Sequence, residues 1–181
     1  MTRCAAALAL ALVSSACFVS SLHPIYVDGA IVFDAALLGR WESRENGVSV
    51  DVARGQWRSY QVAYTDRSGT THFTGHLTRI GQARFLNLRP EDGLERPAFL
   101  VATNGFLQVE TTPAGVRVRE PDYAALLERV QAGTAGTPAA LDLKDNIVLT
   151  GPSAPLRSWV EASLKHEAFW AEWKTFTRST P

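Results

Sequence analysis

The stretch "NGVSVDVARGQWRSYQVAYTDRSGTTHFTGHLTR", residues 46–79, alternates apolar and polar side chains in short runs that are separated by turns. In the first run, Val48, Val50 and Val52 fall on one side of an extended chain, with polar residues between them. An Asn-Gly pair at 46–47 precedes this run and is a strong two-residue hairpin signal. Such alternation is typical of half-buried antiparallel strands.

The same alternation continues to residue 119, and each run ends at glycine, proline, asparagine or aspartate. After a first strand that begins near Arg40, we predict further strands at residues 47–53, 58–65, 71–79, 83–89, 98–103, 106–110 and 116–119. An antiparallel sheet of about eight strands can close on itself, which removes its unpaired edges. The sequence therefore predicts an α+β, mostly β fold, in which an antiparallel meander forms a barrel or a strongly curved sheet.

Helical patterns appear only after this meander. Residues 120–133 and 151–167 have apolar stripes at helical spacing, and a short strand is expected between them at 145–150. The aromatic residues of "FWAEWKTF", residues 169–176, also fall at helical spacing, which predicts a stripe packed on the sheet. A partner surface or a lipid interface is the alternative for this stripe. We expect one β-domain, residues 34–181, with its helices at the carboxyl-terminal end.

The segment "DAALLGRWES", residues 34–43, resembles the start of lipocalin-like barrels. In those barrels a short helical turn leads into a first strand that carries Gly-x-Trp, here Gly39 and Trp41. The resemblance implies that Trp41 closes one end of the barrel. We interpret Arg117 and Arg119 as ordinary surface charges, and the resemblance implies the alternative that they cover the end of the barrel against Trp41 as a barrel-closing arginine does.

The amino-terminal "MTRCAAALALALVSSAC" has the order of a secretory signal peptide, residues 1–16. Arg3 precedes an apolar run from Ala5 to Val13, and small residues follow. The run is too short to cross a bilayer, since a spanning helix needs about 20 apolar residues. We therefore expect a leader that is removed rather than an anchor.

The sequence Ser14-Ser15-Ala16-Cys17 resembles the lipobox of bacterial lipoproteins. The resemblance implies cleavage between Ala16 and Cys17, a diacylglyceryl group on the thiol and an acyl chain such as palmitate on the new amino terminus. Residues 17–33 would then be a lipid-anchored tether. The alternative is ordinary cleavage, which gives a soluble secreted or periplasmic protein.

The residues around this site support a location in the cell envelope. Cys4 leaves with the leader, so Cys17 has no partner for an internal disulfide. Phe18 stands where an aspartate would retain a lipoprotein in the inner membrane, so the resemblance implies the outer membrane, facing the periplasm. The run from residue 21 to 43 is also similar to a group of uncharacterised bacterial lipoproteins, which implies a location in the envelope and a fold but no activity.

Composition and motifs exclude several function classes. The chain has 18 basic and 18 acidic residues, so no basic excess favours nucleic acid. No nucleophile elbow, phosphate-binding glycine loop or dinucleotide fingerprint occurs. His72 and His76 lie about 13 Å apart along a strand, too far to share one zinc ion. We expect no metal, no cofactor and no catalytic residue.

The remaining hypotheses concern binding. The preferred function is a lipid-anchored cell-envelope protein that acts as a non-enzymatic binding or interaction module for an envelope protein or a small apolar ligand. The alternatives are a lipocalin-like carrier of such a ligand and an envelope hydrolase whose site is assembled only in the fold. A pocket would be lined by Tyr60, Tyr64, Phe73 and Leu77. Because bulky residues crowd the inner faces, however, we expect a mostly filled barrel.

Overall fold

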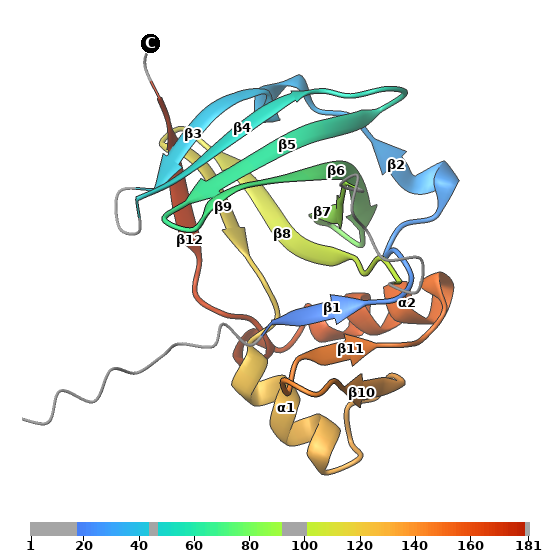
Figure 1. Cartoon of the computed structure of the whole chain (residues 1–181). Coiled ribbons are helices and arrows are strands. Elements are labelled where there is room, and N and C mark those ends of the chain that lie inside the picture. The colour runs from blue at the N-terminus through green and yellow to red at the C-terminus, as the bar shows by residue number, and fades with distance from the viewer. Residues whose placement is uncertain (1–17, 44–46, 92–100, 180–181) are drawn as a thin grey trace, which may run out of the picture.

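The computed structural model describes residues 18–43, 47–91 and 101–179, which form a β-barrel with a small sheet and two helices beside it (Figure 1). The predicted leader, residues 1–16, and the predicted lipidation site at Cys17 lie outside the described residues.

Within the described ranges, eight strands form a closed antiparallel barrel. They are β3 (Gly39–Ser43), β4 (Val48–Arg54), β5 (Ser59–Asp66), β6 (Gly69–Ile80), β7 (Ala83–Pro90), β8 (Gly105–Thr112), β9 (Gly115–Arg119) and β12 (Lys174–Arg178). Their order is β6-β5-β4-β3-β12-β9-β8-β7, and β7 pairs again with β6 to complete the ring. The predicted α+β barrel is confirmed, and its shape is compatible with a lipocalin-like fold.

The strand that closes the barrel comes from the carboxyl-terminal end of the described chain. β12 pairs with β9 through Lys174 to Phe176 and with β3 through Thr177 and Arg178. Seven barrel strands therefore precede the helices, and the eighth follows them. The predicted strand at 98–103 is not this eighth strand, because its described part, residues 101–103, has no strand pairing.

The predicted helical stripe over residues 169–176 is wrong. The 3-10 helix η3 (Glu167–Phe169) ends at its first aromatic residue, and the chain then runs extended into β12. Within β12, Phe176 lines the barrel interior, whereas Phe169 and Trp170 pack among the helices. The aromatic spacing matches a helix only by coincidence, because the side chains divide between two separate cores.

In Figure 1 the small sheet lies on the same side of the barrel as the two helices, and β1 is its strand nearest the barrel. β1 (Val19–Ser21) pairs in parallel with β11 (Ile147–Leu149), which pairs antiparallel with β10 (Ala139–Leu141). The helices are α1 (Tyr123–Gln131) and α2 (Ser153–Ser163). The side chain of Asp122 caps α1 by accepting a hydrogen bond from the Ala125 N–H at 2.8 Å. No helix of the described part of the chain is long and apolar enough to span a membrane.

The expectation of a tether is wrong for residues 18–33, because they belong to the fold. Besides β1, the segment contains the 3-10 helix η1 (Asp28–Ala30) and β2 (Ile31–Val32), which pairs with β6 beyond the end of β5. Ile25 is completely buried, and its N–H donates to Asn87 Oδ1 at 3.1 Å. A second 3-10 helix, η2 (Ala35–Leu37), then leads into β3.

Two hydrophobic cores result from this arrangement. The barrel interior contains Leu37, Trp41, Tyr60, Val62, Leu77, Val109 and Val116. The outer core lies between the barrel, the small sheet and the helices, and contains Ile25, Ile80, Phe85, Phe106, Leu126, Ile147, Leu149, Leu156, Val160, Phe169 and Trp170. Successive residues of β7 and β8 point to opposite sides, so each strand contributes to both cores.

Closure by β12 requires a residue without a side chain at Gly115. Its φ is +143°, and a Cβ there would overlap the carbonyl oxygen of Phe176 in β12. Gly69 offers a matched control, because its φ is +134° but a Cβ there meets no atom within 4 Å. We expect Gly69→Ala to lower the free energy of unfolding by about 1–2 kcal/mol through backbone strain alone. Gly115→Ala should cost at least about 1 kcal/mol more, measured by urea denaturation. Equal losses would contradict the packing of β12 on β9.

Candidate functional site

The barrel encloses a cavity of about 500 Å³. Its lining is mostly apolar and consists of Phe18, Leu37, Trp41, Val48, Val50, Val52, Tyr60, Val62, Tyr64, Phe73, Leu86, Leu88, Leu107, Val109, Val116, Val118, Arg119, Glu120, Lys174 and Phe176. The expectation of a mostly filled barrel is therefore wrong. Seven of the lining residues are valines, whose short side chains do not reach across the barrel.

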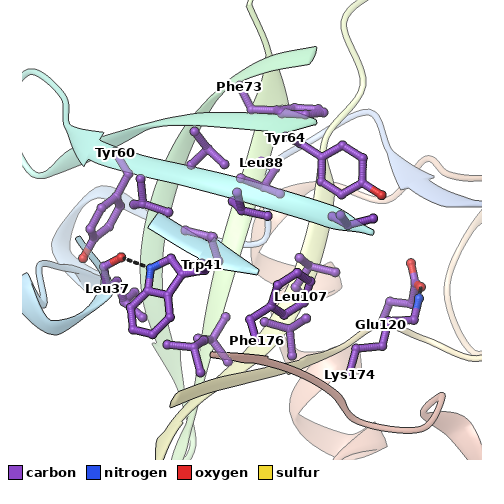
Figure 2. Close-up of a pocket in the computed structure, with 18 of the residues that line it drawn as sticks. Leu37, Trp41, Tyr60, Tyr64, Phe73, Leu88, Leu107, Glu120, Lys174 and Phe176 are labelled. Atoms are coloured by element: carbon purple, nitrogen blue, oxygen red, sulfur yellow. Dashed lines mark hydrogen bonds and ion pairs between the residues drawn. The ribbon is translucent and has the colours of Figure 1, made fainter. Parts of the chain in front are cut away.

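The predicted pocket residues are only partly brought together. Tyr60, Tyr64 and Phe73 line the cavity, from β5 and β6. Leu77 is completely buried in the same core but does not line the cavity. Figure 2 shows Tyr60 beside Trp41 and Leu37 on one side of the cavity, whereas Tyr64 lies on the side of Glu120 and Lys174.

One end of the barrel is closed around Trp41. Its indole Nε1–H donates to the Leu37 carbonyl at 2.9 Å, which connects β3 to η2. The guanidinium of Arg178 lies 4.6 Å from the centre of the Trp41 ring, a cation–π contact from β12. A Cβ at Gly39 would lie 2.7 Å from Nη1 of Arg178, so the glycine of the Gly-x-Trp motif makes room for this arginine.

Tyr60 seals the same end from β5. Its hydroxyl accepts a hydrogen bond from the Asp34 N–H at 2.7 Å and lies 3.2 Å from the Asp34 carbonyl, to which it donates. The Tyr60 ring stacks on the Phe33 ring with centroids 4.9 Å apart. The Arg54 guanidinium lies over the Phe33 ring, 4.2 Å from its centre. Burial raises the pKa of the Tyr60 hydroxyl, so it stays a neutral hydrogen-bonding group.

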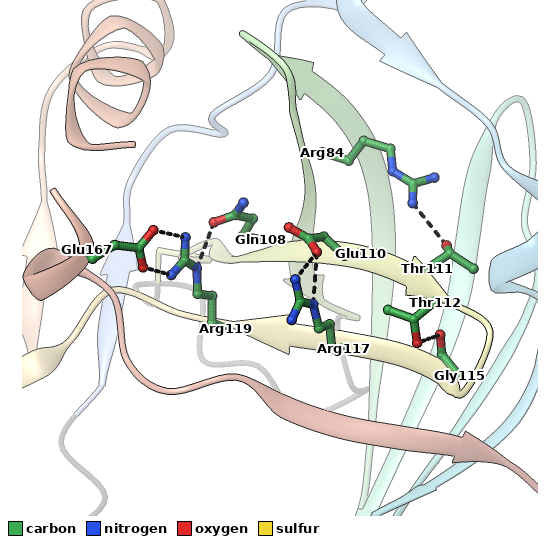
Figure 3. Close-up of polar contacts among 9 residues, drawn as sticks. All are labelled: Arg84, Gln108, Glu110, Thr111, Thr112, Gly115, Arg117, Arg119 and Glu167. Carbon is green, nitrogen blue, oxygen red and sulfur yellow. Dashed lines mark hydrogen bonds and ion pairs between the residues drawn. The ribbon is translucent and has the colours of Figure 1, made fainter. Parts of the chain in front are cut away.

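The predicted packing of Arg117 and Arg119 against Trp41 is wrong, because both contact Trp173 instead. Arg117 is paired with Glu110 at 2.5 Å. Arg119 is only 7% exposed, and it donates to Gln108 and to Glu167 (Figure 3). The closing arginine is Arg178, which the sequence pattern does not single out because the residues before it, 169–176, have aromatic side chains at helical spacing.

The other end of the cavity is open and carries charged side chains. Glu120 and Lys174 form an ion pair of 2.8 Å there, and both are about half exposed (Figure 2). Phe18 also lines this end and is 50% exposed. Hydrogen bonding to Arg119 lowers the pKa of the Glu167 carboxyl, which keeps that carboxylate ionised beside the buried guanidinium. The cavity thus combines an apolar interior with ionic groups at its open end.

The two strand histidines have different surroundings. His76 is half-buried and its ring centroid lies 4.9 Å from that of Tyr26. Burial lowers the pKa of His76, because the charged imidazolium is disfavoured there. His72 lies opposite Ala63 on the neighbouring strand. Among the residues that the structure places, no group of three or more His, Cys, Asp or Glu side chains could hold a metal ion.

Comparisons with known proteins leave the site to be interpreted from its own geometry. A scan of protein-family models and searches of curated proteins and of solved structures return no match to this chain. The resemblances seen in the amino-terminal 43 residues therefore stay predictions, apart from the barrel itself, which is compatible with a lipocalin-like fold.

Proposed function

We propose that this chain is a lipid-anchored cell-envelope protein whose barrel binds one small apolar or amphiphilic ligand without transforming it. The observation that carries the proposal is the apolar cavity of about 500 Å³. Pockets for small molecules have volumes of about 300–1,000 Å³ and combine apolar walls with a few polar groups. This cavity meets both conditions, so we favour a carrier over an interaction module that uses only its outer surface.

The distribution of polar groups indicates how a ligand would lie. At the closed end, the hydroxyl of Tyr60 and the indole of Trp41 already have backbone partners. An apolar tail is therefore the part of the ligand that suits this end. At the open end, Lys174 and Glu120 are half exposed, and either can exchange its partner for a polar head group. We infer a ligand with an apolar body and at most one polar end.

Lipid anchoring is the second part of the proposal, and it rests on the resemblance of residues 14–17 to a lipobox. A thioether from Cys17 to the diacylglyceryl group would remove the only thiol of the mature chain. One acyl chain gives marginal membrane binding, whereas several chains anchor a protein stably. The proposed carrier would thus stay at one membrane surface.

Ligand binding is tested with a hydrophobic fluorescent dye and with fatty acids, using the chain from residue 18 without its anchor. We expect Leu107→Trp to place a large side chain inside the cavity and to weaken dye binding at least about tenfold. Val27→Trp is the matched control, because Val27 is exposed and outside the cavity lining. This control should bind as the wild type does.

The readout is a fluorescence titration, with circular dichroism to verify that each variant is folded. Binding at about one dye per chain that is lost only in Leu107→Trp supports the proposal. An absence of binding by the wild type, or equal binding by both tryptophan variants, would contradict it.

The anchor is tested by expressing the full chain with its leader in a bacterium that lipidates proteins. We expect the wild type to partition into detergent and its amino-terminal peptide to carry the mass of diacylglycerol on Cys17. Cys17→Ser should remain uncleaved or become soluble. An unmodified Cys17 at a free amino terminus, found by mass spectrometry, would refute the anchor without affecting the dye result.

A further inference from the structure

We propose that the open end of the barrel faces the membrane that carries the Cys17 anchor, and that the turn at residues 142–146 contacts the lipid head groups there. The inference rests on the anchor of the proposed function. It names the source of the ligand, which is the lipid leaflet in which the protein is anchored.

The first step is the fixed position of Phe18. Its N–H donates to Asn146 Oδ1 at 3.2 Å, and its carbonyl accepts from the Ile147 N–H at 3.1 Å. From there the chain continues directly into β1, which is paired with β11. Because Phe18 also lines the open end of the cavity, this end is held beside the first described residue of the chain.

The second step is the short connection to the lipid. Consecutive Cα atoms are 3.8 Å apart, so an anchor on Cys17 begins one residue from the cavity lining. A flexible tether would let the barrel turn away from the bilayer, but residues 19–21 are already a paired strand. An anchored barrel therefore has little freedom to point its open end toward water.

The third step is the apolar surface next to this point. Leu143 is fully exposed, and Leu141 is also exposed. A single exposed leucine is common on protein surfaces, so its location is what matters here. Asn146 holds the turn that carries Leu143 next to Phe18. Its Nδ2 donates to Asp142 within the turn, and its Oδ1 accepts from the Phe18 N–H. The turn and the anchor point are thus joined by one side chain.

The charges of the turn indicate a shallow contact. The carboxylate of Asp142 accepts hydrogen bonds from the backbone N–H groups of Lys144 and Asn146, at 2.7 and 2.9 Å. This arrangement holds the turn rigid and presents Leu143 at its tip. The Asp142 carboxylate stays ionised, since the hydrogen bond from the Asn146 side chain, together with these backbone bonds, lowers its pKa. We therefore expect Leu143 to reach the boundary between head groups and acyl chains, with Asp142 remaining in the head-group layer.

Trp57 provides the matched reference site at the opposite end of the barrel. It is exposed and lies in the turn between β4 and β5, next to the closed end where Arg54 covers Phe33. The eight residues of β5 lead from this turn to the open end, which corresponds to about 26 Å of extended chain. A label at Trp57 should therefore remain in water when the open end contacts lipid.

The experiment uses the lipidated protein itself. Cys4 leaves with the leader and the thiol of Cys17 carries lipid, so Leu143→Cys and Trp57→Cys each supply a single free thiol. Each variant is labelled with an environment-sensitive fluorophore and reconstituted in vesicles of phosphatidylethanolamine and phosphatidylglycerol, with and without brominated lipid. We expect quenching of at least about twofold and a blue shift at residue 143, and little change at residue 57.

The outcomes separate this inference from the proposed function. Equal quenching at both sites, or stronger quenching at residue 57, would overturn the orientation even though the protein is lipidated and binds dye. A Cys17 without lipid would overturn both the anchor and this inference, whereas dye binding by the cavity would be unaffected. Normal dye binding by both labelled variants verifies that they are folded.

Discussion

The pairing of β12 with both β3 and β9 is the constraint on which the rest of the structure depends. Without this strand the other seven barrel strands would form an open sheet, with β3 and β9 as its unpaired edges. Because β12 follows α2 in the chain, the helices and the small sheet are held beside the barrel by the same closure. On the side of β9, Gly115 permits the close approach of β12. On the side of β3, Arg178 of β12 packs against the ring of Trp41.

The cavity and its polarity follow from this closed ring. An eight-stranded barrel is just wide enough to be filled by side chains or to hold one small ligand, so the sizes of the inward residues decide the outcome. Valines on β4, β5, β8 and β9 leave the centre open, whereas Trp41, Leu37 and Tyr60 block one end. The amino-terminal strand β1 brings Phe18 to the other end. The two ends of the described chain thus complete the barrel and define its open end, which links the proposed carrier to the proposed orientation at a membrane.

The sequence predicted most of the barrel because strand alternation is a local property. Residues 46–79 show their inward and outward faces directly, and of the four predicted pocket residues on β5 and β6 all but Leu77 line the cavity. The β12 strand was missed because its pairing is with residues far away in the chain, and its aromatic neighbours have a spacing that imitates a helix. β1 and β2 were missed for a related reason, since strands of two or three residues carry no measurable periodicity.

Cavity volume depends on how deep side chains reach into a closed ring, and a list of apolar residues does not contain that information. For the same reason Arg178 could not be recognised as the partner of Trp41.

Hydrogen exchange of the backbone amides of β12, followed by two-dimensional NMR, tests the closure most directly. The protected amides of Lys174–Arg178 should exchange as slowly as those of β3 and β9, because strands that close one ring open together in a cooperative unit. Exchange of β12 at the rate of an unstructured peptide, while β3 to β9 stay protected, would contradict the closed barrel and with it the cavity on which the proposed function rests.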